Sequence, residues 1–368
     1  MEKIIKAAMD RGASALHIKA GDVFRARIDG QLTPLTKQAL TPDQTRAIAL
    51  RLISNEEDRA RIDTMQDYDC SWGAQGIGRF RVNILKQRSS FMIVMRVIPF
   101  EVPSVDSLRL PNVLKTIVEA ERGLILVTGV SGSGRSSTVA ALIHQINATQ
   151  HKHILSLDHP IEFLHRDIQC AITQREVGVD TDSVAVGLRA ALRQDPDVIL
   201  VGELGDNETI GTAMEAVEAG RLLVATLPTP DVESTVLAVL AMFPADKQDV
   251  ARARLAETLQ AVVSQRLLTK KGVPGRVAAV EIMIVTPAIR DLIRDKDRTG
   301  EMRDVIANGR EPFGMQTFDQ HLADLVANDE VEYEVARAAS TRPTDFERSM
   351  HTDHRRSTTA PTIIRPPA

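Results

Sequence analysis

Apolar and polar positions in the early part of the chain follow the pattern of a small α+β domain. Residues 1–11 place apolar side chains at helical spacing. Four later runs alternate between apolar and polar residues, as strands with one buried face do; they cover residues 15–19, 24–28, 78–86 and 91–98. Asp29-Gly30 predicts a hairpin turn, and Thr41-Pro42-Asp43-Gln44 carries the capping signals of a helix that reaches about residue 52.

From about residue 110 to residue 295 the pattern changes to short apolar runs that alternate with helical segments. The runs suit strands buried on both faces of a parallel sheet, and they cover residues 123–129, 153–158, 197–202 and 222–227. Helical spacing separates them at residues 135–149, 184–193 and 207–218. This alternation predicts an α/β layered domain. A further strand is expected at residues 277–284, with helices from residue 288 to about residue 339.

Prolines and changes of pattern divide the chain into five segments. We expect a first domain at residues 1–98 and a proline-containing linker at residues 99–111. The α/β domain covers residues 112–295, and a helical region covers residues 296–339. Residues 340–368 are rich in Ser, Thr, Pro and Arg, so we expect a disordered tail there.

Composition narrows the class of protein. The chain has 368 residues, of which 43% are hydrophobic and 26% charged, as in ordinary soluble globular proteins. Its net charge of -4 and its 3% of aromatic residues argue against a nucleic-acid partner. Cys70 and Cys170 fit no metal or redox spacing. With no signal peptide and no run near the ~18 apolar residues of a membrane span, we expect a cytoplasmic protein.

The most specific local signal is a glycine-rich sequence between an apolar strand and a helix. In this context glycines let backbone N–H groups face a phosphate, and the helix N-terminus adds partial positive charge. We predict a phosphate-binding loop made by Gly129, Ser131, Gly132, Ser133, Gly134, Arg135, Ser136 and Ser137. Ser136 is the candidate hydroxyl ligand of Mg²⁺. The alternative is a glycine-rich turn without a ligand, and Arg135 stands where such loops have a lysine.

Two apolar strands end in carboxylates at the edge where ligands bind in α/β sheets. Glu203 follows residues 197–202 and is a candidate to hold Mg²⁺ or the attacking water. Asp158 ends residues 153–158 and is a candidate general base, or a partner of a metal ligand. Glu203 alone could be a solvated loop residue, and Asp158 alone could be an ordinary strand-ending aspartate before a proline turn. Together with a phosphate loop, they favour phosphoryl chemistry.

With these motifs on one chain, the sequence resembles the type IV pilus retraction ATPases, the PilT/PilU group of the bacterial secretion ATPase superfamily. The resemblance covers about residues 1–340. It is carried by the phosphate loop and by residues 78–83, 158–163, 173–177, 193–203, 243–246 and 281–294. Residues 281–294 are similar to a motif of the PilT branch, whereas residues 314–319 and the longer C-terminal part are closer to the PilU branch.

The resemblance implies a PAS-like N-terminal domain, a RecA-like P-loop ATPase domain and a helical C-terminal region. It implies a hexameric ring, homomeric or mixed with a paralogous retraction ATPase, that uses ATP and Mg²⁺. The ring would dock on the inner-membrane platform protein of the pilus machine, at the cytoplasmic face of that membrane and without a lipid anchor of its own. Arg81 and Arg96 match arginines that reach the phosphates, and Glu203 and Asp158 match the catalytic acids.

Departures from the family concentrate in the expected active site. Arg135 replaces a lysine, Asp158 replaces a glutamate that is one methylene longer, and Pro228 replaces a histidine. Gly205 stands where the family often has an arginine, and Arg221 is a candidate replacement charge. We therefore expect a retraction motor with reduced turnover. The alternative is a hydrolysis-deficient nucleotide-binding paralogue that assembles with an active retraction ATPase or regulates it, and the cargo could also be a related secretion or DNA-uptake filament.

Overall fold

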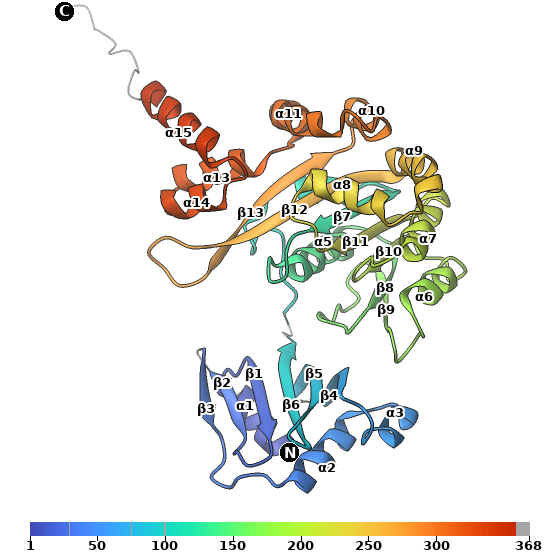
Figure 1. The fold of residues 1–368 in the computed structure, drawn as a ribbon, viewed down its shortest axis with the longest axis vertical. Coiled ribbons are helices and arrows are strands. Elements are labelled where there is room, and N and C mark those ends of the chain that lie inside the picture. Colours follow the sequence, from blue (N-terminus) through green and yellow to red (C-terminus); the bar gives the residue numbers. More distant parts are fainter. Residues whose placement is uncertain (29, 75, 99–100, 358–368) are drawn as a thin grey trace, which may run out of the picture. The chain divides into compact units, whose positions relative to one another are not determined.

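The computed structural model of the chain describes residues 1–28, 30–74, 76–98 and 101–357, with side chains described as far as residue 350. These residues form two compact units (Figure 1). The first unit contains Met1–Val102, Leu155–Asp167 and Ile172–Gly187. The second unit contains Pro103–Ile154, Ile168–Ala171 and the chain from Leu188 onward.

The first unit is built on a six-stranded sheet with the strand order β3-β2-β1-β6-β5-β4, in which neighbouring strands are antiparallel. The strands are β1 Ala15–Lys19, β2 Arg25–Ile28, β3 Gln31–Pro34, β4 Asp67–Ala74, β5 Gly78–Gln87 and β6 Ser90–Ile98. The helices are α1 Glu2–Met9, α2 Pro42–Leu52 and α3 Glu56–Ala60. Alternation along β5 puts Phe80 and Val82 in the core and leaves Arg79 and Arg81 on the other face.

The local signals of the first unit are confirmed where the structure describes them. Helix α2 begins at the predicted capping box, because Thr41 Oγ1 accepts from the N–H of Gln44 at 3.2 Å and Gln44 Oε1 accepts from the N–H of Thr41 at 2.9 Å. Strands β2 and β3 pair as a hairpin, although Asp29 of the predicted turn lies outside the described residues. Strand β4 was not predicted, because its sequence is largely polar and only Cys70 in it is buried.

A seven-stranded sheet with the order β13-β12-β7-β11-β10-β8-β9 carries the α/β part of the chain. Its strands are β7 Gly123–Thr128, β8 His153–Asp158, β9 Ala171–Glu176, β10 Val198–Val201, β11 Leu222–Leu227, β12 Leu259–Thr269 and β13 Arg276–Ile284. Strand β7 runs parallel to β11 and β12, and β10 runs parallel to β11, whereas β12 and β13 are antiparallel. Every residue of β7 and β11 is buried, which explains their continuous apolar sequences.

The helices of this part are α4 Val113–Ile117, α5 Arg135–Thr149, α6 Val184–Ala191, α7 Asn207–Glu218, α8 Val232–Ala241, α9 Gln248–Thr258, α10 Pro287–Arg294, α11 Met302–Asn308, α12 Arg310–Phe313, α13 Phe318–Ala327, α14 Tyr333–Ala339 and α15 Pro343–Ser357. The predicted boundaries of α5 and α7 agree with the structure. No helix in the described ranges combines the length and the apolar character needed to cross a membrane.

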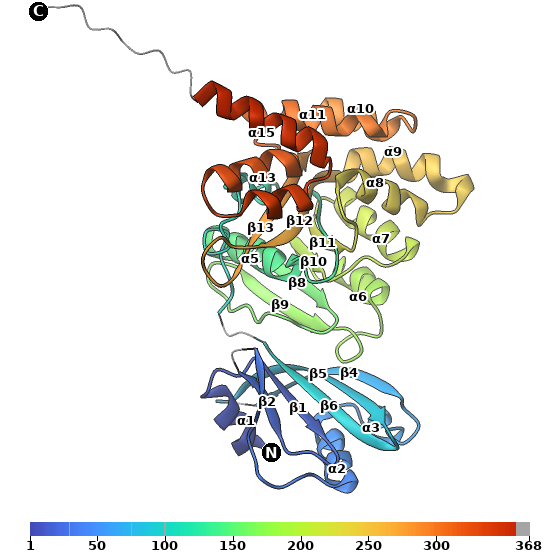
Figure 2. The same ribbon diagram turned by 60° about the vertical axis from the view of Figure 1, so that its left-hand side comes forward.

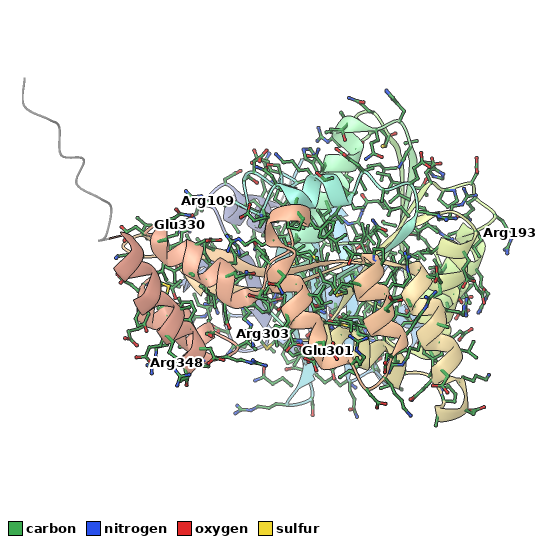
Figure 3. The ribbon with its side chains drawn as sticks, turned by 90° about the horizontal axis from the view of Figure 1, so that it is seen from above. Arg109, Arg193, Glu301, Arg303, Glu330 and Arg348 are labelled. Atoms are coloured by element: carbon green, nitrogen blue, oxygen red, sulfur yellow. The ribbon has the colours of Figure 1, made fainter. Side chains whose placement is uncertain are left out.

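Helix α13 packs against strand β13 and helix α14 against strand β12, and helix α15 packs on these two helices (Figure 2). Their small core contains Phe318, Leu322 and Phe346. Arg109 Nη1 donates to Glu330 Oε2 at 3.0 Å and ties this region to the start of the unit (Figure 3). The expected disordered tail at residues 340–368 is therefore wrong for Pro343–Ser357, because Phe346 gives this helix a buried anchor. Residues 358–368 of that prediction lie outside the described residues.

Candidate functional site

The glycine-rich loop lies at the carboxyl end of β7 and leads directly into α5. Gly129, Gly132 and Gly134 have φ angles of 149°, 79° and 93°, a region that favours glycine. A Cβ atom on Gly129 would lie 2.4 Å from Ser133 Oγ and 2.6 Å from the backbone oxygen of Gln265. These glycines are therefore required by the path of the backbone and not only tolerated.

The first turn of α5 is open to an anionic ligand. Its N-cap residue is Gly134, which has no side chain to satisfy the free N–H groups of a 15-residue helix. Ser133 Oγ is buried and has no hydrogen-bond partner among the residues that the structure describes. Free N–H groups, an unpaired hydroxyl and a helix N-terminus are the donors that a phosphate takes. The loop fits a phosphate group.

Arg135 and Glu203 form an ion pair beside this loop. Arg135 is the first residue of α5, and Glu203 follows β10 at the carboxyl edge of the same sheet. Arg135 Nη1 lies 3.3 Å from Glu203 Oε2, and the arginine side chain is 16% exposed. The carboxylate predicted to face a metal is therefore shared with a guanidinium, and a cation can bind Glu203 fully only when this pair opens.

Few protein ligands are available for a metal ion. Within the described ranges, no group of three or more His, Cys, Asp and Glu side chains is arranged to hold one. Mg²⁺ in phosphate sites commonly uses only one or two protein ligands beside phosphate and water. The two predicted ligands, Ser136 and Glu203, are compatible with that coordination.

Asp158 ends β8 and belongs to the first compact unit. Its carboxylate accepts a hydrogen bond from Ser156 Oγ at 2.7 Å, so the short side chain is held by its own strand. Burial raises the pKa of Asp158 to about 6, and repulsion from Glu162 and Glu176 adds to the effect, while the Ser156 and Gln174 hydrogen bonds oppose it. A partly buried carboxyl group with a pKa near neutrality is suited to take up a proton.

The predicted arginines lie opposite each other on neighbouring strands. Arg81 on β5 pairs in register with Arg96 on β6. Like charges at directly opposite positions destabilise a sheet unless an anion compensates them. Arg81 Nη1 meets such a group, Glu162 Oε1, at 3.3 Å. An anionic ligand would therefore compete with Glu162 for Arg81.

Arg221 does not serve as a replacement charge at the phosphate loop of its own chain. Leu222, the first residue of β11, is in register with Gly123, whereas the loop follows Thr128 at the opposite end of β7. Arg221 lies 3.7 Å from Asp195 at that far edge of the sheet. The prediction for Arg221 is wrong, because a six-residue strand separates it from the loop by on the order of 17 Å. Pro228 follows β11 at the near edge and has no N–H to donate.

The sequence analysis missed the polar residues of β12. Thr128 Oγ1 lies 2.7 Å from Ser264 Oγ and 3.3 Å from Thr235 Oγ1, which links β7, β12 and α8. The next residue, Gln265, donates from Nε2 to the backbone oxygen of Ser133 at 2.6 Å. Ser264-Gln265-Arg266 separates two apolar pairs, Val262-Val263 and Leu267-Leu268, and this interruption was the available signal.

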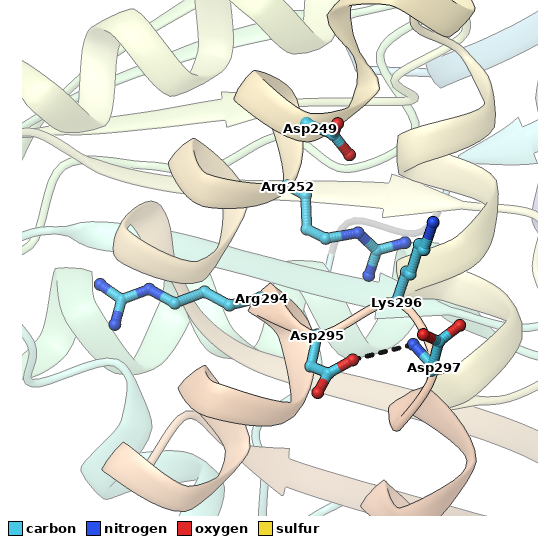
Figure 4. Close-up of a pocket in the computed structure, with 6 residues that line it drawn as sticks. All are labelled: Asp249, Arg252, Arg294, Asp295, Lys296 and Asp297. Carbon is cyan, nitrogen blue, oxygen red and sulfur yellow. Dashed lines mark hydrogen bonds between the residues drawn. The ribbon is translucent and has the colours of Figure 1, made fainter.

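Away from the phosphate loop, a pocket of about 470 Å³ lies between α9 and the end of α10 (Figure 4). Its lining is entirely charged: Asp249, Arg252, Arg294, Asp295, Lys296 and Asp297. Arg252 Nη1 donates to the backbone oxygen of Ile293 at 2.8 Å, so one of its cations already supports the end of α10. Acidic and basic side chains are present in equal number there, so the pocket favours neither an anionic nor a cationic ligand.

Comparison with known proteins identifies the family. Residues 1–331 match the family described as type II/IV secretion system protein. The type IV pilus retraction ATPase PilT of Pseudomonas aeruginosa is 41% identical over 336 residues, which cover 91% of this chain and 96% of the relative. The type IV pilus ATPase PilU of the same organism is 37% identical over 94% of this chain and 90% of its own length.

Solved structures agree with this relationship. A crystal structure of the pilus retraction motor PilT with bound ADP superimposes with a TM-score of 0.85 and 38% identity, covering 95% of this chain and 99% of that one. The ATPase DotB of Legionella pneumophila shares the fold, with a TM-score of 0.82 and 23% identity. The chain belongs to the type II/IV secretion system protein family. Within that family its sequence places it in the group of type IV pilus retraction ATPases, as its motifs predicted, and the predicted fold class is confirmed.

Proposed function

We propose that the chain is a motor subunit of a type IV pilus machine that couples ATP hydrolysis to pilus retraction and twitching motility. The observation that carries the proposal is the open phosphate loop that follows β7, with Glu203, which follows β10, paired to its Arg135. Relatives of matching length and 37–41% identity are named as type IV pilus ATPases, and this supports the assignment of the cargo.

Nucleotide binding divides among the described residues by their chemistry. The backbone and side chains of residues 129–137 bind the phosphates, and α5 adds its N-terminal partial charge. Ser136 and Glu203 are the proposed Mg²⁺ ligands, and the metal would neutralise phosphate charge there. Asp158 takes up the proton of the attacking water, and Arg81 and Arg96 supply positive charge to the phosphates.

Reduced turnover follows from two of the contacts described above. Arg135 shares the Glu203 carboxylate at 3.3 Å, and Ser156 holds the Asp158 carboxylate at 2.7 Å. Neither carboxylate is therefore free to move to a metal ion or a water molecule without breaking a contact. A displacement of about 1 Å at a catalytic group can cost about a hundredfold in rate.

Assembly and location are proposed on the same basis. The chain forms a hexameric ring, alone or mixed with a retraction ATPase paralogue, and docks on the platform protein at the cytoplasmic face of the inner membrane. The domain boundaries at residues 98, 111, 295 and 339 remain predictions from the sequence.

The Arg135–Glu203 ion pair favours one alternative function. If the pair persists when nucleotide is bound, the chain binds ATP without useful hydrolysis and tunes the ring of an active retraction ATPase. Deleting the gene in its own bacterium tests the pilus role shared by both functions. We expect surface pili to remain while twitching is lost, and normal twitching would contradict both.

The raised pKa of Asp158 predicts two pH effects. Hydrolysis should increase as the pH rises through about 6, because only the ionised carboxylate accepts a proton. The folded state binds this proton more tightly than the unfolded chain does. The contribution of Asp158 to the free energy of unfolding is therefore fully present below pH 3.8, the ordinary pKa of the group, and is lost as the pH rises through about 6.

Asp158→Asn provides the control for both effects. We compare the melting temperature of the variant minus that of the wild type at two pH values. This difference should be larger at about pH 8 than at about pH 5, because the amide does not ionise and so carries no cost of burying a charge. Equal differences at the two pH values would contradict the buried, protonatable state of Asp158.

A further inference from the structure

Gln265 stands at the point where β12 passes the phosphate loop. The last register pair of β12 with β7 joins Ser264 to Thr128. Gln265 is one residue further along and is therefore level with Gly129, the first residue of the loop. Its side chain is only 1% exposed, so the amide must find its partners inside the protein.

The amide is bonded to the loop itself. Gln265 Nε2 donates to the backbone oxygen of Ser133 at 2.6 Å. In a trans peptide the C=O and N–H groups point in opposite directions. Holding the Ser133 oxygen toward β12 therefore turns the N–H of Gly134 away from β12, to the side where a phosphate would be cradled.

Two glycines of the loop lie close to the same residue. A Cβ on Gly129 would lie 2.6 Å from the backbone oxygen of Gln265, and a Cβ on Gly134 would lie 2.9 Å from its Nε2 atom. The loop thus closes over Gln265 at its first and last turns. A change at Gln265 alters the surface against which the loop is formed.

Unsatisfied polar atoms surround this contact. Ser133 Oγ and Gln265 Oε1 are both buried and have no hydrogen-bond partner in the described part of the chain. Such atoms carry a desolvation cost, and they are found where a ligand or water completes the arrangement. Their grouping at one loop indicates a site held ready for a ligand.

We infer that Gln265 is a positioning residue that fixes the backbone of the phosphate loop for nucleotide binding. The inference rests on the proposed function and adds a residue of β12 to that site. The two residues that flank Gln265 on β12 are themselves held in place. Ser264 Oγ is hydrogen-bonded to Thr128 Oγ1 at 2.7 Å, and Arg266 Cζ lies 3.9 Å from the centroid of the Phe318 ring in the C-terminal helices.

The test compares Gln265→Met with Gln260→Met in the full-length protein. Methionine keeps the length of the side chain but cannot donate, and Gln260 lies at the other end of the same strand beside Gly123. The readouts are the dissociation constant of a fluorescent ADP analogue and the rise in melting temperature that ADP causes. We expect affinity about tenfold weaker for Gln265→Met, as the loss of one buried hydrogen bond predicts, and unchanged affinity for Gln260→Met.

A second variant separates positioning from general stability. Gln265→Glu keeps the shape, and its carboxyl group donates to the Ser133 oxygen only when protonated. Its affinity should therefore recover toward that of the wild type as the pH is lowered. Wild-type affinity in both variants, with only a lower melting temperature, would overturn the inference. Absence of ADP binding by the wild-type protein would instead overturn the proposed function.

Discussion

The double variant Arg135→Lys, Asp158→Glu is expected to hydrolyse MgATP about a hundredfold faster than the wild-type protein. Lysine carries a compact charge without the fork that reaches Glu203 at 3.3 Å. Glutamate extends the carboxylate by ~1.5 Å beyond the position at which Ser156 holds it. Steady-state phosphate release by the purified oligomer, measured at equal subunit concentration, tests this result.

Controls for the double variant come from the same chain. Arg276→Lys makes the same chemical change at an exposed position that begins β13 and should leave turnover unaltered. Glu203→Gln sets the background rate. If the double variant stays at that background, the loss of catalysis lies elsewhere, and adding Pro228→His is the next variant to measure.

Gly129→Ala should weaken nucleotide binding by at least about a hundredfold. The residue has a φ angle of 149°, and an added Cβ would lie 2.6 Å from the backbone oxygen of Gln265 in strand β12. The loop must therefore change its path, and the N–H groups of the cradle lose their common direction. Titration with a fluorescent ADP analogue measures the loss.

Gly211→Ala is the matched control for that variant. It lies inside α7, an added Cβ meets no atom within 4 Å, and its backbone is ordinary for a helix. Its affinity should equal that of the wild type, and its melting temperature should not fall. Nucleotide binding by Gly129→Ala at wild-type strength would contradict the assignment of this loop as the phosphate site.

The elements with strong local patterns could be predicted from the sequence. Strands β7 and β11 are buried at every position and therefore read as continuous apolar runs. Helix α5 follows a glycine loop, and helix α2 follows a capping box, so their first residues were predictable. The phosphate loop was predicted because its glycines are required by backbone geometry that few other residues adopt.

Contacts between distant residues could not be predicted in the same way. The Arg135–Glu203 pair depends on β7 and β10 flanking β11 in one sheet, which no local pattern reveals. Gln265 carried no interpretation at all from the sequence, because only the register of β12 places it against the loop. Helix α15 looked like a tail because its apolar residues are few, yet Phe346 is buried against α14.

Hydrolysis of MgATP by the purified full-length oligomer, with Glu203→Gln as the background, tests the central claim most directly. The account predicts saturable ADP binding together with turnover that is slow but clearly above the Glu203→Gln rate. Nucleotide binding with turnover equal to that background would contradict a motor and leave the regulatory paralogue. Failure to bind nucleotide at all would contradict the assignment of the phosphate loop on which both functions depend.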